Sequence, residues 1–296
     1  FRKKDSKRYE KQIKYKEMKP PSIVIVLVLL WSLPIMAAEE DVPQTAFCNE
    51  SIQITSDSVQ STNPAIYREN IVWIKEYQQV MLFNKNLNRT TPVIDAYRVG
   101  EQPTIFEEKI VWIEFAEDAQ VMMCDLRKNG HGGGCLENDA KTQVTSDLSL
   151  KLRPKIMKKT IVWQQFDGND FEIMLCDFRK NGHAGGCLMN DTKEQLTNNS
   201  LEDKNVDITE EYLVWQTKKE SNDEDITLYD RNTNKSETFE EPGNQQDPVI
   251  KQQKKDYQIV YWTNEMGNDD IMERTKKGKR KLMTSEYDEW MPAISK

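Results

Sequence analysis

The chain has 296 residues and a formal net charge of −8, with 37% hydrophobic residues, which is sufficient for one domain with a sizeable core. Its charge is uneven, because residues 1–38 carry 9 basic and 3 acidic residues while the rest carries 32 basic and 46 acidic residues. A body this acidic repels a phosphate backbone, so the composition argues against a nucleic-acid partner.

The N-terminal residues have the pattern of an export signal. Lys19 precedes an apolar run from Ser22 to Met36, and the small residues Ala37 and Ala38 follow it. This order predicts a signal peptide within residues 1–38, cleaved near Ala38. Met18 would be its natural start, which leaves residues 1–17 as a basic extension. Residues 39–50 are then expected to be a linker.

An uncleaved membrane anchor is the alternative to cleavage. The run from Ser22 to Ala38 has 17 residues, at the lower limit for a membrane span, and Pro34 interrupts it. We favour cleavage, so we expect an exported protein with no membrane span after processing. The sequence leaves open whether it is periplasmic, bound at the cell surface or secreted.

Residues 51–296 contain a five-fold repeat centred on an apolar triplet that ends in tryptophan. Successive tryptophans are 39, 51, 52 and 47 residues apart, which is the range of propeller blades. The fifth copy, from Ile259 to Trp262, is interpreted as the same triplet with one extra residue. We expect the five tryptophans to fill the space between blades as core residues: Trp73, Trp112, Trp163, Trp215 and Trp262.

Each repeat predicts four antiparallel strands. A Pro-x-Ile element lies before most of the triplets and is expected to begin the innermost strand, since proline is tolerated at a strand start. Further runs of β-branched and aromatic residues follow, bounded by Asn, Asp, Gly and Ser. The sequence therefore predicts an all-β propeller with five complete blades.

Two short segments predict part of a sixth blade. Ser51–Thr55 matches the fourth strand of a blade, and Pro292–Ile294 matches the first. Because closure limits exposed sheet edges, we expect them to be the edge strands of an incomplete sixth blade, in a natural chain that continues after Lys296. The alternative is a closed ring in which the fifth blade packs directly on the first.

The repeat resembles the TolB-type β-propeller family. The residues that carry the resemblance include Pro64-Ala65-Ile66, Asp225–Asp230 and Thr142–Thr145. The resemblance covers Ser51 to Lys296 and implies the fold. It leaves function open, because the family includes periplasmic and cell-surface interaction proteins as well as propeller domains attached to enzymes. The segment Tyr67–Asn70 replaces the Ser-Pro-Asp-Gly turn that is common in the family.

Four of the five cysteines lie at the ends of two similar loops, each enclosing ten residues. In an exported protein this spacing predicts a disulfide across each loop, Cys124–Cys135 and Cys176–Cys187. Cys48 is left without a partner. A metal site is the alternative, because the loops hold the only histidines, but each loop offers three ligands at a spacing unlike common zinc sites.

The same two loops supply the candidate binding residues. Each contains an Arg-Lys pair and a histidine, and these six are expected to face a ligand: Arg127, Lys128, His131, Arg179, Lys180 and His183. The glycines beside the histidines are explained as turn residues.

No catalytic residue and no cofactor is expected, because the known catalytic signatures are absent from the sequence. Calcium is the one alternative. Acid-rich hairpin tips could supply oxygen ligands, although none has the EF-hand spacing and all are ordinary turn sequences. These tips are Asp167–Asp170, Asn222–Asp225 and Gly267–Asp270.

The sequence predicts a non-catalytic propeller that binds a protein, a glycan or another component of the cell envelope. The alternative is a carboxylate-dependent enzyme resembling a glycoside hydrolase, which needs a pair of acids in a central pocket. Among the residues expected to begin the inner strands only Asp207 is acidic, which argues against that pair.

Overall fold

The computed structural model divides the chain into residues 1–53 and residues 54–296, and all described strands lie in the second unit. The structure describes residues 52–95, 102–115, 117–129, 135, 141–178, 187, 193–254, 256–265, 267–282, 289 and 292–294. Within these residues, no helix has the length and apolarity needed to cross a membrane. The predicted signal peptide and Cys48 lie outside the described residues.

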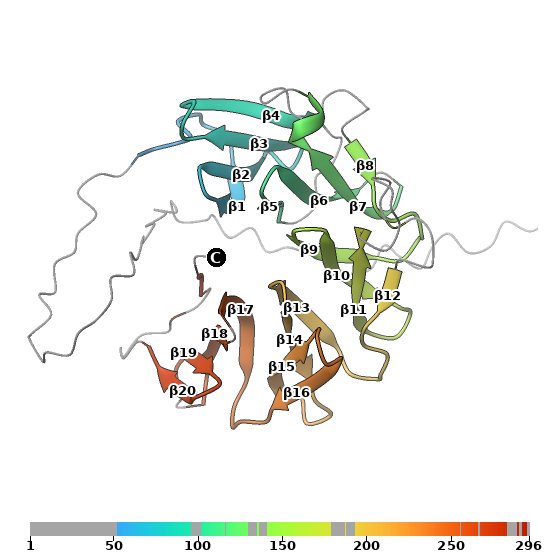
Figure 1. Ribbon diagram of the computed structural model, residues 1–296, viewed down its shortest axis with the longest axis vertical. Coiled ribbons are helices and arrows are strands. Elements are labelled where there is room, and N and C mark those ends of the chain that lie inside the picture. The colour runs from blue at the N-terminus through green and yellow to red at the C-terminus, as the bar shows by residue number, and fades with distance from the viewer. Residues whose placement is uncertain are drawn as a thin grey trace, which may run out of the picture. The chain divides into compact units, whose positions relative to one another are not determined.

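Five antiparallel sheets of four strands follow one another along the chain, which confirms the predicted all-β fold. In each sheet the strands pair in chain order, and we call these sheets blades 1 to 5. In Figure 1 the blades succeed one another in chain order, with strands β1, β5, β9, β13 and β17 innermost.

The first three blades have the following strands. Blade 1 contains β1 (Ser61–Tyr67), β2 (Asn70–Lys75), β3 (Gln79–Asn84) and β4 (Arg89–Asp95). Blade 2 contains β5 (Thr104–Phe106), β6 (Lys109–Phe115), β7 (Ala119–Asp125) and β8 (Lys141–Gln143), with a short 3₁₀ helix at Leu126–Asn129. Blade 3 contains β9 (Lys151–Met157), β10 (Thr160–Phe166), β11 (Phe171–Asp177) and β12 (Lys193–Gln195).

The last two blades repeat the pattern. Blade 4 contains β13 (Asp203–Ile208), β14 (Tyr212–Lys218), β15 (Glu224–Asp230) and β16 (Lys235–Phe239). Blade 5 contains β17 (Gln245–Gln253), β18 (Asp256–Thr263), β19 (Asp270–Thr275) and β20 (Gly278–Lys281).

The core consists of apolar clusters at the junctions between successive blades. Trp112 lies in the cluster that joins blades 1 and 2, Trp163 in the one that joins blades 2 and 3, and Trp215 in the one that joins blades 3 and 4. These side chains are at most 3% exposed. Each blade therefore covers its apolar face with its neighbour, as large aromatic side chains in a stacked sheet require.

The assignment of Trp262 to the core is wrong. Val260 pairs with Val249 as Val162 pairs with Lys155 in blade 3, so Tyr261 is the counterpart of Trp163. Tyr261 is 1% exposed and lies in the cluster between blades 4 and 5. Trp262 is only partly buried. The fifth triplet is Ile259-Val260-Tyr261, and it contains no extra residue.

The prolines do not begin most inner strands, contrary to the prediction. Pro64, Pro154 and Pro248 lie inside β1, β9 and β17, immediately after the residue at which the pairing with the next strand shifts. Only Pro103 directly precedes its strand, β5. At a β-bulge the ladder is interrupted, so the missing N–H of proline costs no hydrogen bond there.

Each inner strand carries a residue with positive φ at the bulge or, in blade 2, just before the strand. We call these five the bulge residues, and they are Asn63, Gln102, Arg153, Asn205 and Asp247, with φ between 43° and 57°. All but Asn205 precede a proline. The left-handed backbone there marks the same bend in every blade.

Buried glutamines connect the bulges of successive blades. The Gln164 side chain accepts a 2.9 Å hydrogen bond from the backbone N–H of Asn205 in the next blade. In the same way, Gln216 accepts a 3.2 Å bond from the backbone N–H of Asp247. Blades 1 and 2 have Ile74 and Ile113 at the corresponding positions. The bulge amides of blades 4 and 5 thus obtain partners that the ladder cannot give them.

The predicted sixth blade has no strands among the described residues. Residues 52–55 and 292–294 lie outside the strands of the structure. Extensive contacts between blades join only consecutive blades in the described part, so direct packing of blade 5 on blade 1 is not observed there. A sixth blade therefore stays a prediction.

Candidate functional site

The two ends of the propeller differ in the chain segments that build them. Because each blade is a four-stranded meander, the turns between its first and second strands and the loops between its third and fourth strands share one end. We call this the loop end. The hairpins between second and third strands lie at the opposite end, which we call the hairpin end.

Both predicted disulfides form, and each closes a loop at the loop end. Cys124 and Cys135 have Cα atoms 5.8 Å apart, and those of Cys176 and Cys187 are 5.9 Å apart. All four cysteines are buried, at most 3% exposed. Each pair packs in the cluster that its blade shares with the preceding blade.

The first loop is also attached to the preceding blade by its backbone. The N–H of Cys135 donates a 2.6 Å hydrogen bond to the carbonyl of Val93 in β4. The disulfide thus fixes the two ends of the loop, and this bond fixes one of them to blade 1.

The six predicted binding residues are described only in part. Arg127 and Lys128 lie in the 3₁₀ helix after β7 and are exposed. The other four lie outside the described residues: His131, Arg179, Lys180 and His183. Their role therefore stays a prediction.

Arg127 and Lys128 line an open groove of about 650 Å³ at the loop end, which we call the basic groove. Six cationic and three acidic residues border it, although the body of the protein has an acidic excess. The cations come from blades 2, 3 and 4 and are Lys109, Arg127, Lys128, Lys158, Lys159 and Arg231. The acids are Glu107, Asp125 and Glu210.

The Arg127 side chain is held by Asp125 on its own blade. Its Nε and Nη2 atoms donate to the two carboxylate oxygens of Asp125 at 2.9 and 2.7 Å, a bidentate pair. This hydrogen bond lowers the pKa of Asp125 and raises the pKa of Arg127. Glu108 adds a weaker ion pair at 3.6 Å. Arg127 is therefore oriented but largely neutralised.

Arg231 reaches the groove from blade 4 and connects it to blade 3. Its Nη1 donates a 2.8 Å bond to the carbonyl of Glu210, and its Nη2 donates a 2.9 Å bond to the hydroxyl of Thr160. Lys158 on the β9–β10 turn forms an ion pair with Glu210. The turns of blades 3 and 4 are thus joined across the groove.

Three lysines of the groove form no ion pair with another described residue: Lys109, Lys128 and Lys159. Burial lowers the pKa of Lys109, and the charge of Arg127 lowers it further. Lys128 and Lys159 are exposed. These ammonium groups are available to a ligand that carries negative charge.

Four groove residues were not among the predicted binding residues: Lys109, Lys158, Lys159 and Arg231. The signal that could have found them is the sign of charge at equivalent turns. Lys158-Lys159 stands where blades 2 and 4 have Glu107-Glu108 and Glu210-Glu211. The groove only becomes visible when three blades are placed side by side.

The one acid among the predicted starts of the inner strands, Asp207, is buried and hydrogen-bonded. Asp207 is 3% exposed, and its Oδ2 accepts a 2.9 Å bond from the backbone N–H of Ile250 in blade 5. Its role in the described structure is to join two blades. The inner strands begin earlier than predicted, so they include two further acids, Asp203 and Asp247.

Asp247 is the acidic bulge residue and is already engaged. Its Oδ1 accepts bonds from Asn205 at 2.8 Å and from Arg153 at 3.3 Å, and its Oδ2 accepts one from Trp262 at 3.3 Å. These donors come from blades 3, 4 and 5. The arrangement stabilises one carboxylate and connects three blades.

One of the three acid-rich tips gathers its carboxylates closely. Asp167, Asp170 and Glu172 on the β10–β11 hairpin have ligand oxygens within 4.8 Å of one another. This cluster lies at the hairpin end, away from the basic groove. Its oxygens are of the type that a hard cation such as Ca²⁺ prefers.

Solved structures share this fold. A putative TolB from Agrobacterium tumefaciens superposes with a TM-score of 0.56 and 10% identity, over 78% of this chain and 83% of that chain. TolB from Acinetobacter baumannii gives a TM-score of 0.58 and 12% identity, over 80% of this chain and 57% of that chain. The chain therefore has the fold of a TolB-type β-propeller.

An enzyme shares the fold as well. An oligogalacturonate lyase solved in complex with manganese gives a TM-score of 0.58 and 11% identity, over 78% of this chain and 66% of that chain. No protein-family model matches the chain, and no curated protein matches its sequence. The likeness therefore defines the fold, and function has to be argued from the site.

Proposed function

We propose that this protein is an exported, non-catalytic β-propeller whose loop end binds an anionic partner of the cell envelope or the exterior. The observation that carries the proposal is the basic groove, where six cations and three acids line about 650 Å³. Such a concentration of positive charge on an acidic body steers a negatively charged ligand to one place.

The chemistry of the ligand follows from the three lysines without described ion pairs. Lys109, Lys128 and Lys159 present ammonium groups from two blades. These groups complement a carboxylate- or phosphate-bearing chain that runs across the groove. Arg127 and Arg231 are held by neighbouring groups and give the groove a defined shape.

The two disulfides support export, because such bonds persist in oxidising compartments. They also suit a binding surface at the loop end. A loop closed at its base loses less conformational freedom when it meets a ligand than an open loop does.

The test is binding of two polyanions, polyglutamate and polygalacturonate, to the full-length chain at low and high salt. We expect a triple variant, Lys109→Gln, Lys128→Gln and Lys159→Gln, to bind about tenfold more weakly, given the modest strength of exposed charge pairs. The matched control replaces Lys235, Lys254 and Lys277, which are exposed on blades 4 and 5 outside the groove. Equal loss in both variants would contradict a groove-specific site.

The carboxylate-dependent enzyme is the rival function. That reaction uses two carboxyl groups about 5–10 Å apart. Among the five bulge residues only Asp247 is acidic, and it accepts hydrogen bonds from Arg153, Asn205 and Trp262. Incubation with polygalacturonate followed by assay of newly formed chain ends distinguishes the two functions. Cleavage that is abolished by Asp247→Asn would replace binding by catalysis.

A further inference from the structure

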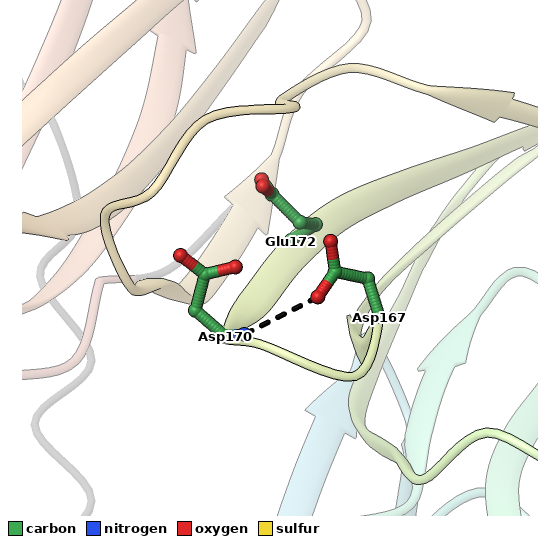
Figure 2. Close-up of side chains that lie close together, drawn as sticks. All are labelled: Asp167, Asp170 and Glu172. Carbon is green, nitrogen blue, oxygen red and sulfur yellow. Dashed lines mark hydrogen bonds between the residues drawn. The ribbon is translucent and has the colours of Figure 1, made fainter.

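The β10–β11 hairpin of blade 3 brings three carboxylates together at the hairpin end (Figure 2). Asp167 and Asp170 lie on the turn, and Glu172 is the second residue of β11. The three side chains surround one small region, and a ligand oxygen from each lies within 4.8 Å of the others. Asp167 Oδ1 accepts hydrogen bonds from the backbone N–H groups of Asn169 and Asp170, at 2.8 and 3.2 Å.

Glu172 is fully buried, and half of its carboxylate lacks a partner. Its exposed fraction is 0%, and its Oε1 accepts a 2.8 Å bond from the backbone N–H of Asn199. Its Oε2 is shielded from solvent and has no hydrogen-bond partner among the described residues. Both carboxylate oxygens of Asp170 are likewise shielded from solvent and have no hydrogen-bond partner among the described residues. Buried carboxylate oxygens normally have a hydrogen-bond or metal partner, so these three oxygens indicate a site where a ligand binds.

The electrostatics agree with this geometry. Burial raises the pKa of Glu172, and the charge of Asp203 raises it further, while the hydrogen bond from the backbone N–H of Asn199 opposes the rise. Burial also raises the pKa of Asp170, and the charge of Asp167 raises it further. Among the described residues, no lysine or arginine forms an ion pair with Asp167, Asp170 or Glu172.

Blades 4 and 5 each have a buried acid at the position equivalent to Glu172, and these two acids can be compared with it. Glu172 pairs with Gln165 on the neighbouring strand, as Asp225 pairs with Thr217 in blade 4 and Asp270 with Thr263 in blade 5. Asp225 and Asp270 are buried as well, 0% and 2% exposed.

In these two blades the acid has a lysine partner. Lys219 forms an ion pair with Asp225, and Lys281 forms one with Asp270 at 2.7 Å. A buried carboxylate is tolerated there because a cation compensates it.

Blade 3 has another acid where blade 4 has its lysine. Lys219 lies two residues after Thr217, and Asp167 lies two residues after Gln165, so the two occupy equivalent positions on their hairpins. Compared with blade 4, blade 3 therefore lacks the lysine cation and has a third carboxylate on its hairpin. A cation from solution would restore the balance that blades 4 and 5 achieve with lysine.

We propose that Asp167, Asp170 and Glu172 bind one Ca²⁺ ion, which supplies the positive charge that lysines provide to the equivalent acids of blades 4 and 5. Carboxylate oxygens bind Ca²⁺ at about 2.3–2.6 Å, so two of its ligands can lie up to about 5 Å apart. The ligand oxygens of the three residues lie within 4.8 Å of one another, inside that limit. Ca²⁺ also accepts irregular oxygen geometry, whereas Mg²⁺ demands a near-ideal octahedron and retains several waters.

The proposal is tested on the full-length chain after treatment with a chelator, with CaCl₂ as the probe. Calorimetric titration should show one site, and Ca²⁺ at about a hundred times its dissociation constant should raise the midpoint of thermal unfolding by about 5 °C. Asp167 is exposed, so Asp167→Asn can be made without disturbing the core. This variant should lose at least half of the shift.

A second variant gives the blade 3 hairpin the lysine that the blade 4 hairpin has. Asp167→Lys places a lysine at the position of Lys219 and should raise the calcium-free midpoint while abolishing the response to Ca²⁺. The matched control is Asp223→Asn, which removes an exposed acid from the hairpin of blade 4 and should keep the full response.

Three results would overturn the site. They are no heat and no shift with Ca²⁺ in the unmodified chain, an unchanged shift in Asp167→Asn, or an equal loss in Asp223→Asn. A larger shift with MgCl₂ than with CaCl₂ would overturn the choice of ion.

Discussion

Blades 3 and 4 have the same framework. In both, a tryptophan packs in the cluster shared with the preceding blade, and the glutamine that follows it accepts the bulge N–H of the next blade. Both also place a buried acid near the start of the third strand. These positions are fixed by burial, since an unpaired amide or an unfilled junction would be costly there.

The same two blades differ at their ends. At the loop end, blade 3 has a disulfide and the turn Lys158-Lys159, whereas blade 4 has the short loop after Asp230 and the turn Glu210-Glu211. At the hairpin end, Glu172 has no described cation and Asp225 has Lys219. The framework is thus constrained by packing, while the reversing segments vary in charge and provide the candidate sites.

Removal of the blade 3 disulfide should have the largest effect. We expect Cys176→Ala with Cys187→Ala to lower the free energy of unfolding by about 2–3 kcal/mol, because the open chain gains loop entropy. Unfolding in denaturant measures it. The matched pair, Cys124→Ala with Cys135→Ala, should lose a similar amount because the spacers are equal. An unchanged denaturant midpoint in either double variant would show that its disulfide contributes nothing to stability.

Replacing a glutamine that connects two blades should have the second-largest effect on the free energy of unfolding. Gln216→Leu leaves the bulge N–H of Asp247 and the amide of Asn205 without this acceptor, which should cost about 1–3 kcal/mol. Gln164→Leu removes one bond, from the bulge N–H of Asn205, and should cost less. Equal costs for the two variants, measured by denaturant unfolding, would argue against this ranking.

The stability of the calcium-free protein should respond to pH through the blade 3 cluster. Glu172 and Asp170 have a raised pKa, so the folded state holds their protons more tightly than the unfolded state does. Their unfavourable contribution is therefore present at neutral pH and disappears as pH falls through the raised pKa. The thermal midpoint of Glu172→Gln should exceed that of the unmodified chain at pH 7.

The same measurement at pH 5 should give a smaller difference. Asp125 in the basic groove has the opposite behaviour, because the hydrogen bond from Arg127 lowers its pKa and the resulting stability is lost as pH falls through that pKa. Added Ca²⁺ should reverse the order of the two proteins at pH 7. If the difference in thermal midpoint between Glu172→Gln and the unmodified chain is the same at pH 7 and pH 5, the carboxylate cluster does not cause the pH dependence.

The smallest effect on stability is expected from Lys158→Ala. The ion pair of Lys158 with Glu210 is about half exposed on both sides, and such pairs contribute less than about 1 kcal/mol. The variant should unfold like the parent while binding polyglutamate less well. A clear loss of stability would mean that this pair holds blades 3 and 4 together.

Much of the framework could be predicted from the sequence. The spacing of the tryptophans predicts five blades, and the equal cysteine spacers predict both disulfides, because these signals depend on local periodicity and loop length. The error at Trp262 has a local cause too. Two aromatic residues in succession satisfy the same pattern, and only the pairing with β17 shows which one points into the core.

The strand unit, its five-fold repetition and the two disulfides can be predicted from the chain, since alternating burial, turns and short loops are properties of neighbouring residues. Which charges come together depends on how the blades pack. The folded structure shows this. It placed lysines and arginines of three blades around one groove, and it left Glu172 buried beside two aspartates with no described lysine. Charge interactions depend on distance and burial, which are set by the packing of one blade against the next.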